Sequence, residues 1–264
     1  MTVVSLVMLE RKDGEPELIE YPVPGLGYET ADCTIDGITG STESGLADAA
    51  AVCALCNDAI IESKEPIGEP TEAALCVLAE KMDRLADDQG VSRWRDQFPR
   101  RATLEFSRDR KSMSVLCQYP GGNRLLVKGA PNLLLQRCTH IRYRNGRTVR
   151  LRGALRRQVD AQLTKLAQRP LRCLALAVKE PRQLERSLRH IRDPSKVFRH
   201  PLLSRPQCFR DVESDLTLVG IVGIKDPARS TAKDAIDQCR AAGIRVRTKQ
   251  EDSHFLLKHF VLCR

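Results

Sequence analysis

The sequence predicts an α+β fold that ends in a short αβ unit. Strand candidates follow one another at 103–106, 112–118 and 124–128, and Gly121-Gly122 forms the turn between the last two. Helical segments interrupt the strands, so helices and consecutive strands are mixed, as in an α+β domain. A strong strand at 215–224 then precedes a helix at 230–242, and this order is typical of a doubly wound sheet.

The first hundred residues predict a strand, two helices and long loops. Residues 1–9 (MTVVSLVML) have the apolar composition of a buried strand, and Lys12-Asp13-Gly14 predicts a turn. Residues 10–45 are rich in Gly, Pro, Asp and Glu and predict a loop, while 46–57 has helical composition. Residues 84–101 are polar and predict another loop.

A second helix is expected to open at the sequence GEPTE and to continue through AALCVLAEKMDRL. Thr71 is a possible N-cap of this helix. Acidic residues stand near its start, where the helix dipole favours negative charge.

The second half of the chain predicts two further helices and a buried strand. Residues 131–138 predict a short helix, and 154–168 shows a clear helical pattern. Residues 171–178 (LRCLALAV) predict a buried strand. Residues 180–214 are rich in Arg, Pro and Ser and are expected to be mobile. After the helix at 230–242, Gly243 is the expected C-cap, and a last strand begins at residue 244.

Charge is distributed unevenly along the chain. The formal net charge is +9, but residues 1–90 have a balance of −14 and the remainder has +23. Such asymmetry is typical of an acidic face beside an anion site, and both nucleotides and nucleic acids are anions. Residues 137–210 hold 20 Lys and Arg but 4 Asp and Glu. A basic nucleic-acid-binding protein is therefore one alternative, although no zinc-finger spacing or aromatic-interleaved RNA motif supports it.

Cysteine spacing and hydropathy argue against a metal site, a membrane span and secretion. Cys53 and Cys56 form a single C-x-x-C, but a zinc site needs a second pair at matching spacing. The ten cysteines are expected to be reduced thiols of a cytosolic protein. No apolar run approaches the length of about 20 residues that a membrane helix needs. No signal-peptide pattern is present, so the chain as written is expected to be cytoplasmic.

Six segments stand in order along the chain: CALCNDA (53–59), GEPTEAAL (68–75), TLEFSRDRKSMSV (103–115), LLVKGAP (125–131), LRCLALA (171–177) and DLTLVGIVGIKDPAR (215–229). Together they resemble the type II P-type ATPases, and most closely the sarco/endoplasmic-reticulum calcium pumps. Any one segment is weak support, whereas six in the family's order and spacing are strong support.

The resemblance implies a domain organisation. Residues 1–225 would form the cytoplasmic nucleotide-binding domain, which in the family is an antiparallel sheet flanked by helices. Residues 226–246 would form part of the Rossmann-like, HAD-like phosphorylation domain, and 226–229 (DPAR) would be the hinge. Residues 247–264 form a tail that departs from the family pattern.

The resemblance also implies an ATP site, with Mg²⁺ arriving on the nucleotide. Phe106 would stack on adenine, and Glu72, with Thr71 beside it, would accept from the adenine amino group. Cations and one apolar wall residue complete the implied site: Arg108, Lys111, Lys128, Arg172 and Leu174. No G-x-x-x-x-G-K-[ST] sequence is present, so a P-loop site is not expected.

Each of these residues also has a purely structural interpretation. Phe106 and Leu174 could be ordinary core residues, because aromatic and aliphatic side chains are mostly buried. Glu72 could be a helix N-terminal acid that the dipole stabilises. The cations could be solvated surface charges. Lys128 is the strongest of them, since it closes an apolar strand directly before Gly129.

The resemblance does not extend to the motifs that the family needs for catalysis and transport. The Asp-Lys-Thr-Gly-Thr motif of the phosphorylated aspartate is not in this sequence, and after Val246 no Thr-Gly-Asp loop follows. We therefore expect a truncated, catalytically incomplete product of the family. Its partners would be ATP and the remaining domains of a pump in the endoplasmic reticulum or another internal membrane, with this domain facing the cytosol. A non-catalytic regulatory or remnant fragment is the second alternative.

A labelling experiment checks the expected catalytic incompleteness. Phosphoryl transfer needs a nucleophile in line with the γ-phosphate and a metal that bridges phosphates. We expect no acid-stable phosphate on the purified chain after incubation with γ-labelled ATP. A labelled chain would contradict this prediction.

Overall fold

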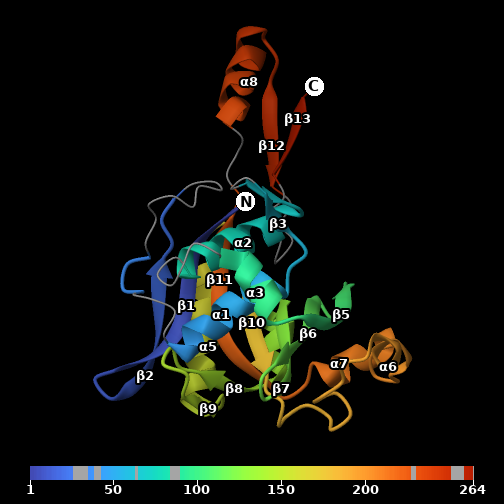
Figure 1. Ribbon diagram of the computed structural model, residues 1–264. Helices are drawn as coiled ribbons and strands as arrows, with labels where there is room; N and C mark the ends of the chain where they lie inside the picture. Colours follow the sequence, from blue (N-terminus) through green and yellow to red (C-terminus); the bar gives the residue numbers. More distant parts are fainter. Residues whose placement is uncertain are drawn as a thin grey trace.

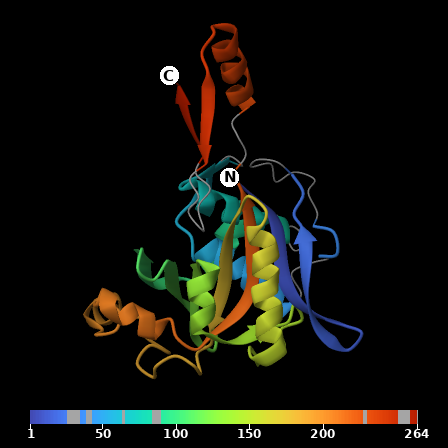
Figure 2. The same cartoon turned by 180° about the vertical axis from the view of Figure 1, so that it is seen from behind.

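A large sheet lies between two layers of helices in the computed structural model (Figures 1 and 2). The structure describes residues 1–25, 35–38, 43–62, 65–83, 90–226, 230–250 and 259–263. On one face lie α1 (Ser44–Leu55), α2 (Pro70–Asp83) and α3 (Gly90–Gln97). On the other lie α4 (Pro131–Leu134) and α5 (Gly153–Ala167). The predicted α+β class, a mainly antiparallel sheet flanked by helices, is confirmed.

Nine strands make up the main sheet. Seven of them follow the order β2-β1-β11-β10-β7-β6-β5, while β8 pairs with β11 and β9 pairs with β8. Their bounds are β1 Thr2–Lys12, β2 Glu15–Pro22, β5 Arg100–Ser107, β6 Ser112–Tyr119, β7 Gly122–Gly129, β8 Cys138–Arg142, β9 Thr148–Arg150, β10 Leu171–Lys179 and β11 Leu216–Lys225. The strands predicted at 1–9, 103–106, 112–118, 124–128, 171–178 and 215–224 are all confirmed.

Strand β11 is the centre of this sheet. It pairs antiparallel with β10 along its length and antiparallel with β1 over its second half. Near its start it pairs in parallel with β8, where Leu216 lies opposite Cys138. Residues 216–224 are all buried, so both faces of the strand need helical cover. Their continuous apolar sequence is therefore typical of a strand that is covered on both sides.

The α1 side of the sheet holds the first hydrophobic core. Helix α1 is buried almost all around, and its small alanine side chains let α2, α3 and the sheet approach closely. Sheet residues of this core include Met113, Leu126, Leu176 and Val222. The predicted helix at 46–57 is confirmed, beginning two residues earlier.

The opposite face holds the second core, which α5 covers through Val159 and Leu166. The segment 180–214 packs against this core. It contains α6 (Pro194–Arg199), η2 (Pro206–Cys208) and α7 (Phe209–Val212). Helix α4 and η1 (Leu135–Arg137) contribute to the same core. Leu184, Leu188 and Ile191 are buried there. The expectation of a mobile segment does not fit this packing, since apolar residues spaced along the Arg-rich sequence anchor it.

Two regions predicted as loops contain regular structure. The loop prediction for 10–45 was wrong for β2, which pairs with β1 in a hairpin whose turn is Asp13-Gly14. Their φ angles are 51° and 89°, as a two-residue type I′ turn requires, and the polar composition of β2 reflects its edge position. The loop prediction for 84–101 missed α3, whose polar face dominates its composition.

Several short strands of the described residues had no sequence prediction. Strands β8 and β9 form a small hairpin beside the start of β11, and β3 (Ile60–Glu62) pairs with β4 (Glu65–Ile67) just before α2. Strands of three to five residues carry too little periodicity to be recognised, because their pairing partners stabilise them.

The C-terminal αβ unit lies apart from the main sheet (Figure 1). Gly243 follows helix α8 (Ser230–Ala241) and has a left-handed φ of 73°. The Ile244 N–H donates to the Cys239 carbonyl at 2.8 Å, and both features confirm the predicted cap at Gly243. Strand β12 (Val246–Gln250) follows and pairs antiparallel with β13 (His259–Cys263). The hinge residues 227–229 and tail residues 251–258 lie outside the described residues, and the domain boundaries stay a prediction.

None of the helices in the described part of the chain is both long and apolar enough to cross a membrane.

A pair of substitutions on α5 tests the second core. Leu166→Ala removes a fully buried side chain and should lower the free energy of unfolding by about 3 kcal/mol. Arg157→Ala, on an exposed position of the same helix, should change it by about 0.5 kcal/mol or less. Urea unfolding of both variants provides the measurement. Equal effects would mean that α5 does not cover the sheet as described.

Candidate nucleotide site

Helix α2 starts at Pro70, so the prediction that Thr71 is its N-cap was wrong. Thr71 is the second residue of the helix, and its hydroxyl bonds outside the helix. Its Oγ1 accepts a hydrogen bond from Arg172 Nη1 at 2.9 Å, which links α2 to β10. Two of the predicted site residues are therefore in direct contact.

Glu72 and Lys128 form a second contact between predicted site residues. Lys128 Nζ donates to Glu72 Oε1 at 2.5 Å, and both side chains are largely buried, with exposed fractions of 9% for the lysine and 16% for the glutamate. Glu72 Oε2 also accepts from the Asp58 N–H at 3.1 Å. A carboxylate has about four lone-pair positions, so Glu72 keeps capacity for a further donor.

The motif at 53–59 fixes the start of α2. Asn57 is fully buried, and its Nδ2 donates to the Cys53 carbonyl at 2.9 Å and to the Glu72 carbonyl at 2.8 Å. Its Oδ1 accepts from the Ala59 N–H at 2.8 Å, while Arg100 Nη2 donates to its carbonyl at 2.7 Å. Asn57 therefore positions Glu72, a role that the sequence did not predict.

Strand register brings three predicted residues to the same face of the sheet. Lys128 lies opposite Leu176 in the β7–β10 pair. Since side chains alternate along a strand, Leu174 and Arg172 share the face of Leu176 and Lys128. Leu174 packs against the first core, so it serves as core and can also serve as a wall of the site.

A β-bulge in β5 decides where Phe106 lies. Leu104 pairs with Ser114 and Ser107 pairs with Ser112, so Glu105 and Phe106 together stand opposite the single residue Met113. Leu104 is buried in the second core, and plain alternation would place Phe106 on the same side. The bulge breaks this alternation, because an extra residue re-aims the side chain. Phe106 is 60% exposed, so the interpretation of this ring as core is wrong.

The turn after β5 presents two cations to solvent. Arg108 and Lys111 are both exposed. Lys111 has a left-handed φ of 47°, and its N–H donates to the Ser107 carbonyl at 2.8 Å. Its own carbonyl accepts from the Ala130 N–H at 2.8 Å, which ties the turn to the end of β7.

Buried thiols lie close to Lys128. Burial raises the pKa of Cys56 and of Cys76 to about 11, and the charge of Lys128 opposes part of this rise in both. Burial therefore disfavours the thiolate form of both residues even more than in a free thiol. Among the described residues, no group of three or more His, Cys, Asp and Glu side chains has a metal-binding arrangement.

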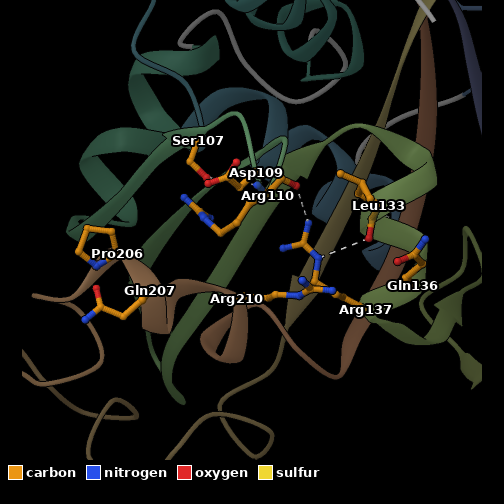
Figure 3. Close-up of a pocket in the computed structure, with 9 residues that line it drawn as sticks. All are labelled: Ser107, Asp109, Arg110, Leu133, Gln136, Arg137, Pro206, Gln207 and Arg210. Atoms are coloured by element: carbon orange, nitrogen blue, oxygen red, sulfur yellow. Dashed lines mark hydrogen bonds between the residues drawn. The ribbon is translucent and has the colours of Figure 1, made fainter. Parts of the chain in front are cut away.

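A cavity of about 380 Å³ lies on the other side of the β5–β6 turn (Figure 3). It is lined by Ser107, Asp109, Arg110, Leu133, Gln136, Arg137, Pro206, Gln207 and Arg210. None of the eight predicted site residues belongs to this lining. The predicted residues lie instead in the first turn of α2, near the ends of β5 and β7, in the β5–β6 turn and near the start of β10, so the cavity is not the predicted nucleotide site.

Comparison with known families identifies the fold. Residues 45–231 match the family described as P-type ATPase, cytoplasmic domain N. The chain belongs to the P-type ATPase family. The match to domain N covers both helical layers and all but the first two strands of the main sheet. It favours the resemblance over a basic nucleic-acid-binding protein.

Three similar proteins carry names that include calcium transport. The chain is 40% identical over 223 residues, 77% of its length, to a "Probable calcium-transporting ATPase" of Trypanosoma brucei brucei. It is 36% identical over 93% of its length to "Calcium-transporting ATPase 4, endoplasmic reticulum-type" of Arabidopsis thaliana, and 35% identical over 86% to "Calcium-transporting ATPase 2, endoplasmic reticulum-type" of the same plant. The aligned part of the chain spans 21–24% of the length of these relatives.

Two glycine substitutions test the tie between the β5–β6 turn and β7. A Cβ at Gly129 would lie 2.7 Å from the Lys111 carbonyl oxygen and 2.8 Å from the Ser112 Cβ. Gly129→Ala should therefore lower the free energy of unfolding by about 1–3 kcal/mol, because strand backbone has to shift. Gly121→Ala meets no atom within 4 Å and should be close to neutral. Thermal unfolding compares the two, and a neutral Gly129→Ala would contradict the close approach.

Proposed function

We propose that this chain binds ATP on the surface formed by the start of α2 and the ends of β5, β7 and β10. The observation that carries the proposal is the exposed ring of Phe106, which the bulge in β5 turns out of the second core. An aromatic ring with a free face is a stacking platform for a base, and stacking contributes about 1–3 kcal/mol per base. Adenine is the base that the family membership favours.

Glu72 and Lys128 are the polar partners that we assign to the nucleotide. The carboxylate of Glu72 is held by Lys128 and by the Asp58 N–H, so it is fixed before the ligand arrives. A fixed acceptor costs less entropy on binding than a mobile one. We infer that Glu72 accepts from the adenine amino group, while Lys128 provides positive charge beside it.

The phosphates would lie toward the exposed cations Arg108, Lys111 and Arg172. Lysine acts on a phosphate as a point charge and arginine as a planar fork. These side chains are solvent-exposed, so each contributes modestly. Association entropy offsets much of the gain, and we expect a dissociation constant in the micromolar to millimolar range, roughly −8 to −4 kcal/mol of binding free energy. Mg²⁺ would arrive on the nucleotide.

We further propose that the chain derives from a calcium-transporting ATPase of the endoplasmic reticulum or another internal membrane. The names of the three similar proteins support this lineage. In the complete pump this domain would face the cytosol and act with the phosphorylation and membrane domains as its partners. Calcium transport would belong to that assembly.

Replacing the proposed platform tests ATP binding. Phe106→Ala should raise the dissociation constant for ATP about tenfold, since it removes the stacking contribution. Phe198→Ala is the matched control, because Phe198 on α6 is 82% exposed and is not one of the residues assigned to the site. Isothermal titration with MgATP, together with NMR of the Phe106, Glu72 and Lys128 amides, provides the measurement.

Three outcomes would contradict the proposal. Wild-type protein that shows no amide shift at millimolar ATP would favour the non-catalytic remnant. Equal losses in the two phenylalanine variants would mean that ATP binds elsewhere. Shifts confined to residues that line the cavity of Figure 3 would move the nucleotide to the other side of the turn.

A further inference from the structure

We propose that Glu213 is a positioning residue that holds the β5 bulge and thereby keeps Phe106 on the nucleotide surface. The role in binding rests on the ATP-binding function proposed above. Glu213 stands at the end of the segment 180–214, directly before β11, and its side chain is completely buried. Its side-chain contacts are to the β5–β6 turn, to the start of β6 and to η1.

The Glu213 carboxylate holds β6 on both sides of the position that faces the bulge. Ser112 Oγ donates to Oε2 at 2.7 Å, and Ser114 Oγ donates to Oε1 at 2.8 Å. Between these two serines lies Met113, the single residue opposite Glu105 and Phe106. The carboxylate therefore holds in place the part of β6 that pairs with the bulge in β5.

Arg110 connects Glu213 to the bulge itself. Its Nη1 forms an ion pair with Glu213 Oε1, and its Nη2 donates to the carbonyl of Glu105, which is a residue of the bulge. The guanidinium carbon lies 5.1 Å from the centre of the Phe209 ring, which contacts it from α7. Because the planar fork has two arms, one guanidinium joins the buried charge to the bulged backbone.

Arg137 closes the cluster from η1. It pairs with Glu213 Oε2, and its Nη2 donates to the Arg110 carbonyl at 3.2 Å. Figure 3 shows Arg137 bonded to the backbone of Arg110 on one side and of Leu133 on the other. One carboxylate thus holds two guanidiniums, and their free arms hold the backbone of the turn that carries Arg108 and Lys111.

A second buried cluster of carboxylates and guanidiniums gives a control. Asp48 on α1 is 5% exposed and pairs with Arg124 at 2.8 Å and with Arg142. Glu180 also pairs with both guanidiniums, so this cluster joins two carboxylates to two guanidiniums. Its ion pairs involve α1, β7, β8 and the residue after β10, and Arg124 lies four residues before Lys128 on β7. Loss of its charge should affect stability without moving Phe106.

The central experiment compares Glu213→Gln with Asp48→Asn in the full chain. Glu213→Gln leaves two guanidiniums without their carboxylate, and Asp48→Asn leaves Arg124 and Arg142 with Glu180 as their remaining carboxylate, so both should lower the melting temperature. At a temperature where both variants are folded, Glu213→Gln should raise the dissociation constant for MgATP about tenfold, whereas Asp48→Asn should not change it. Unchanged binding in Glu213→Gln, or equal weakening in both variants, would overturn the proposal.

Arg110→Lys provides a second variant in case Glu213→Gln does not fold. It keeps the positive charge opposite Glu213 but lacks the second arm that reaches the Glu105 carbonyl. It should weaken MgATP binding to a similar degree. Wild-type affinity in Arg110→Lys would mean that the arginine does not hold the bulge.

A double-variant cycle tests whether Glu213 acts through Phe106. The Phe106→Ala chain has already lost the stacking platform, so adding Glu213→Gln should weaken binding little further. Independent losses that multiply would contradict the route through the bulge.

Amide exchange separates this proposal from the function on which it rests. The Lys111 N–H is bonded to the Ser107 carbonyl within the turn, and its exchange reports the turn without any nucleotide. Glu213→Gln should accelerate exchange at Lys111 relative to wild type and to Asp48→Asn. If the wild-type chain does not bind ATP, the proposed function fails, and exchange alone then decides whether Glu213 positions the turn. Unchanged exchange would overturn that role.

Discussion

Burial of β11 on both faces is the constraint on which the rest of the structure depends. This strand pairs with β10, β1 and β8, so it joins the first strand of the chain to strands from its middle. Its backbone groups are satisfied by these neighbours, and its two rows of apolar side chains have to be covered from both sides. The two helical layers and the two separate cores follow from that requirement.

The candidate site lies where strands of this sheet end beneath α2. Buried Asn57 fixes the start of the helix, which places Glu72 beside Lys128 and Thr71 beside Arg172. These bonds hold polar groups in place without a ligand, so a nucleotide would meet a largely preformed surface. Three of its cations, Arg108, Lys111 and Arg172, are exposed to solvent. The proposed binding of a nucleotide would therefore be weak.

Much of the fold could be predicted from sequence, because its longest elements carry strong periodic signals. Strand β11 is a nearly continuous apolar segment, β6, β7 and β10 each contain a run of apolar residues, and α5 shows an amphipathic pattern. Sequence reasoning failed where pairing or packing decides the structure. Strand β2 has a polar sequence because it is an edge strand, so its composition predicted a loop. The segment 180–214 was predicted to be mobile because arginines separate the buried leucines that anchor it.

The sequence by itself determined the α+β class, the family resemblance and the residue types at the candidate site. Only the tertiary structure decided which of these residues meet. The bulge that exposes Phe106 depends on the register between β5 and β6. One extra residue in a strand does not change the amino-acid composition in a recognisable way, so the sequence did not predict it. The same holds for Glu213, which is 107 residues from Phe106 in the chain. Its carboxylate reaches the β5–β6 turn because the folded sheet places the end of the segment 180–214 next to that turn.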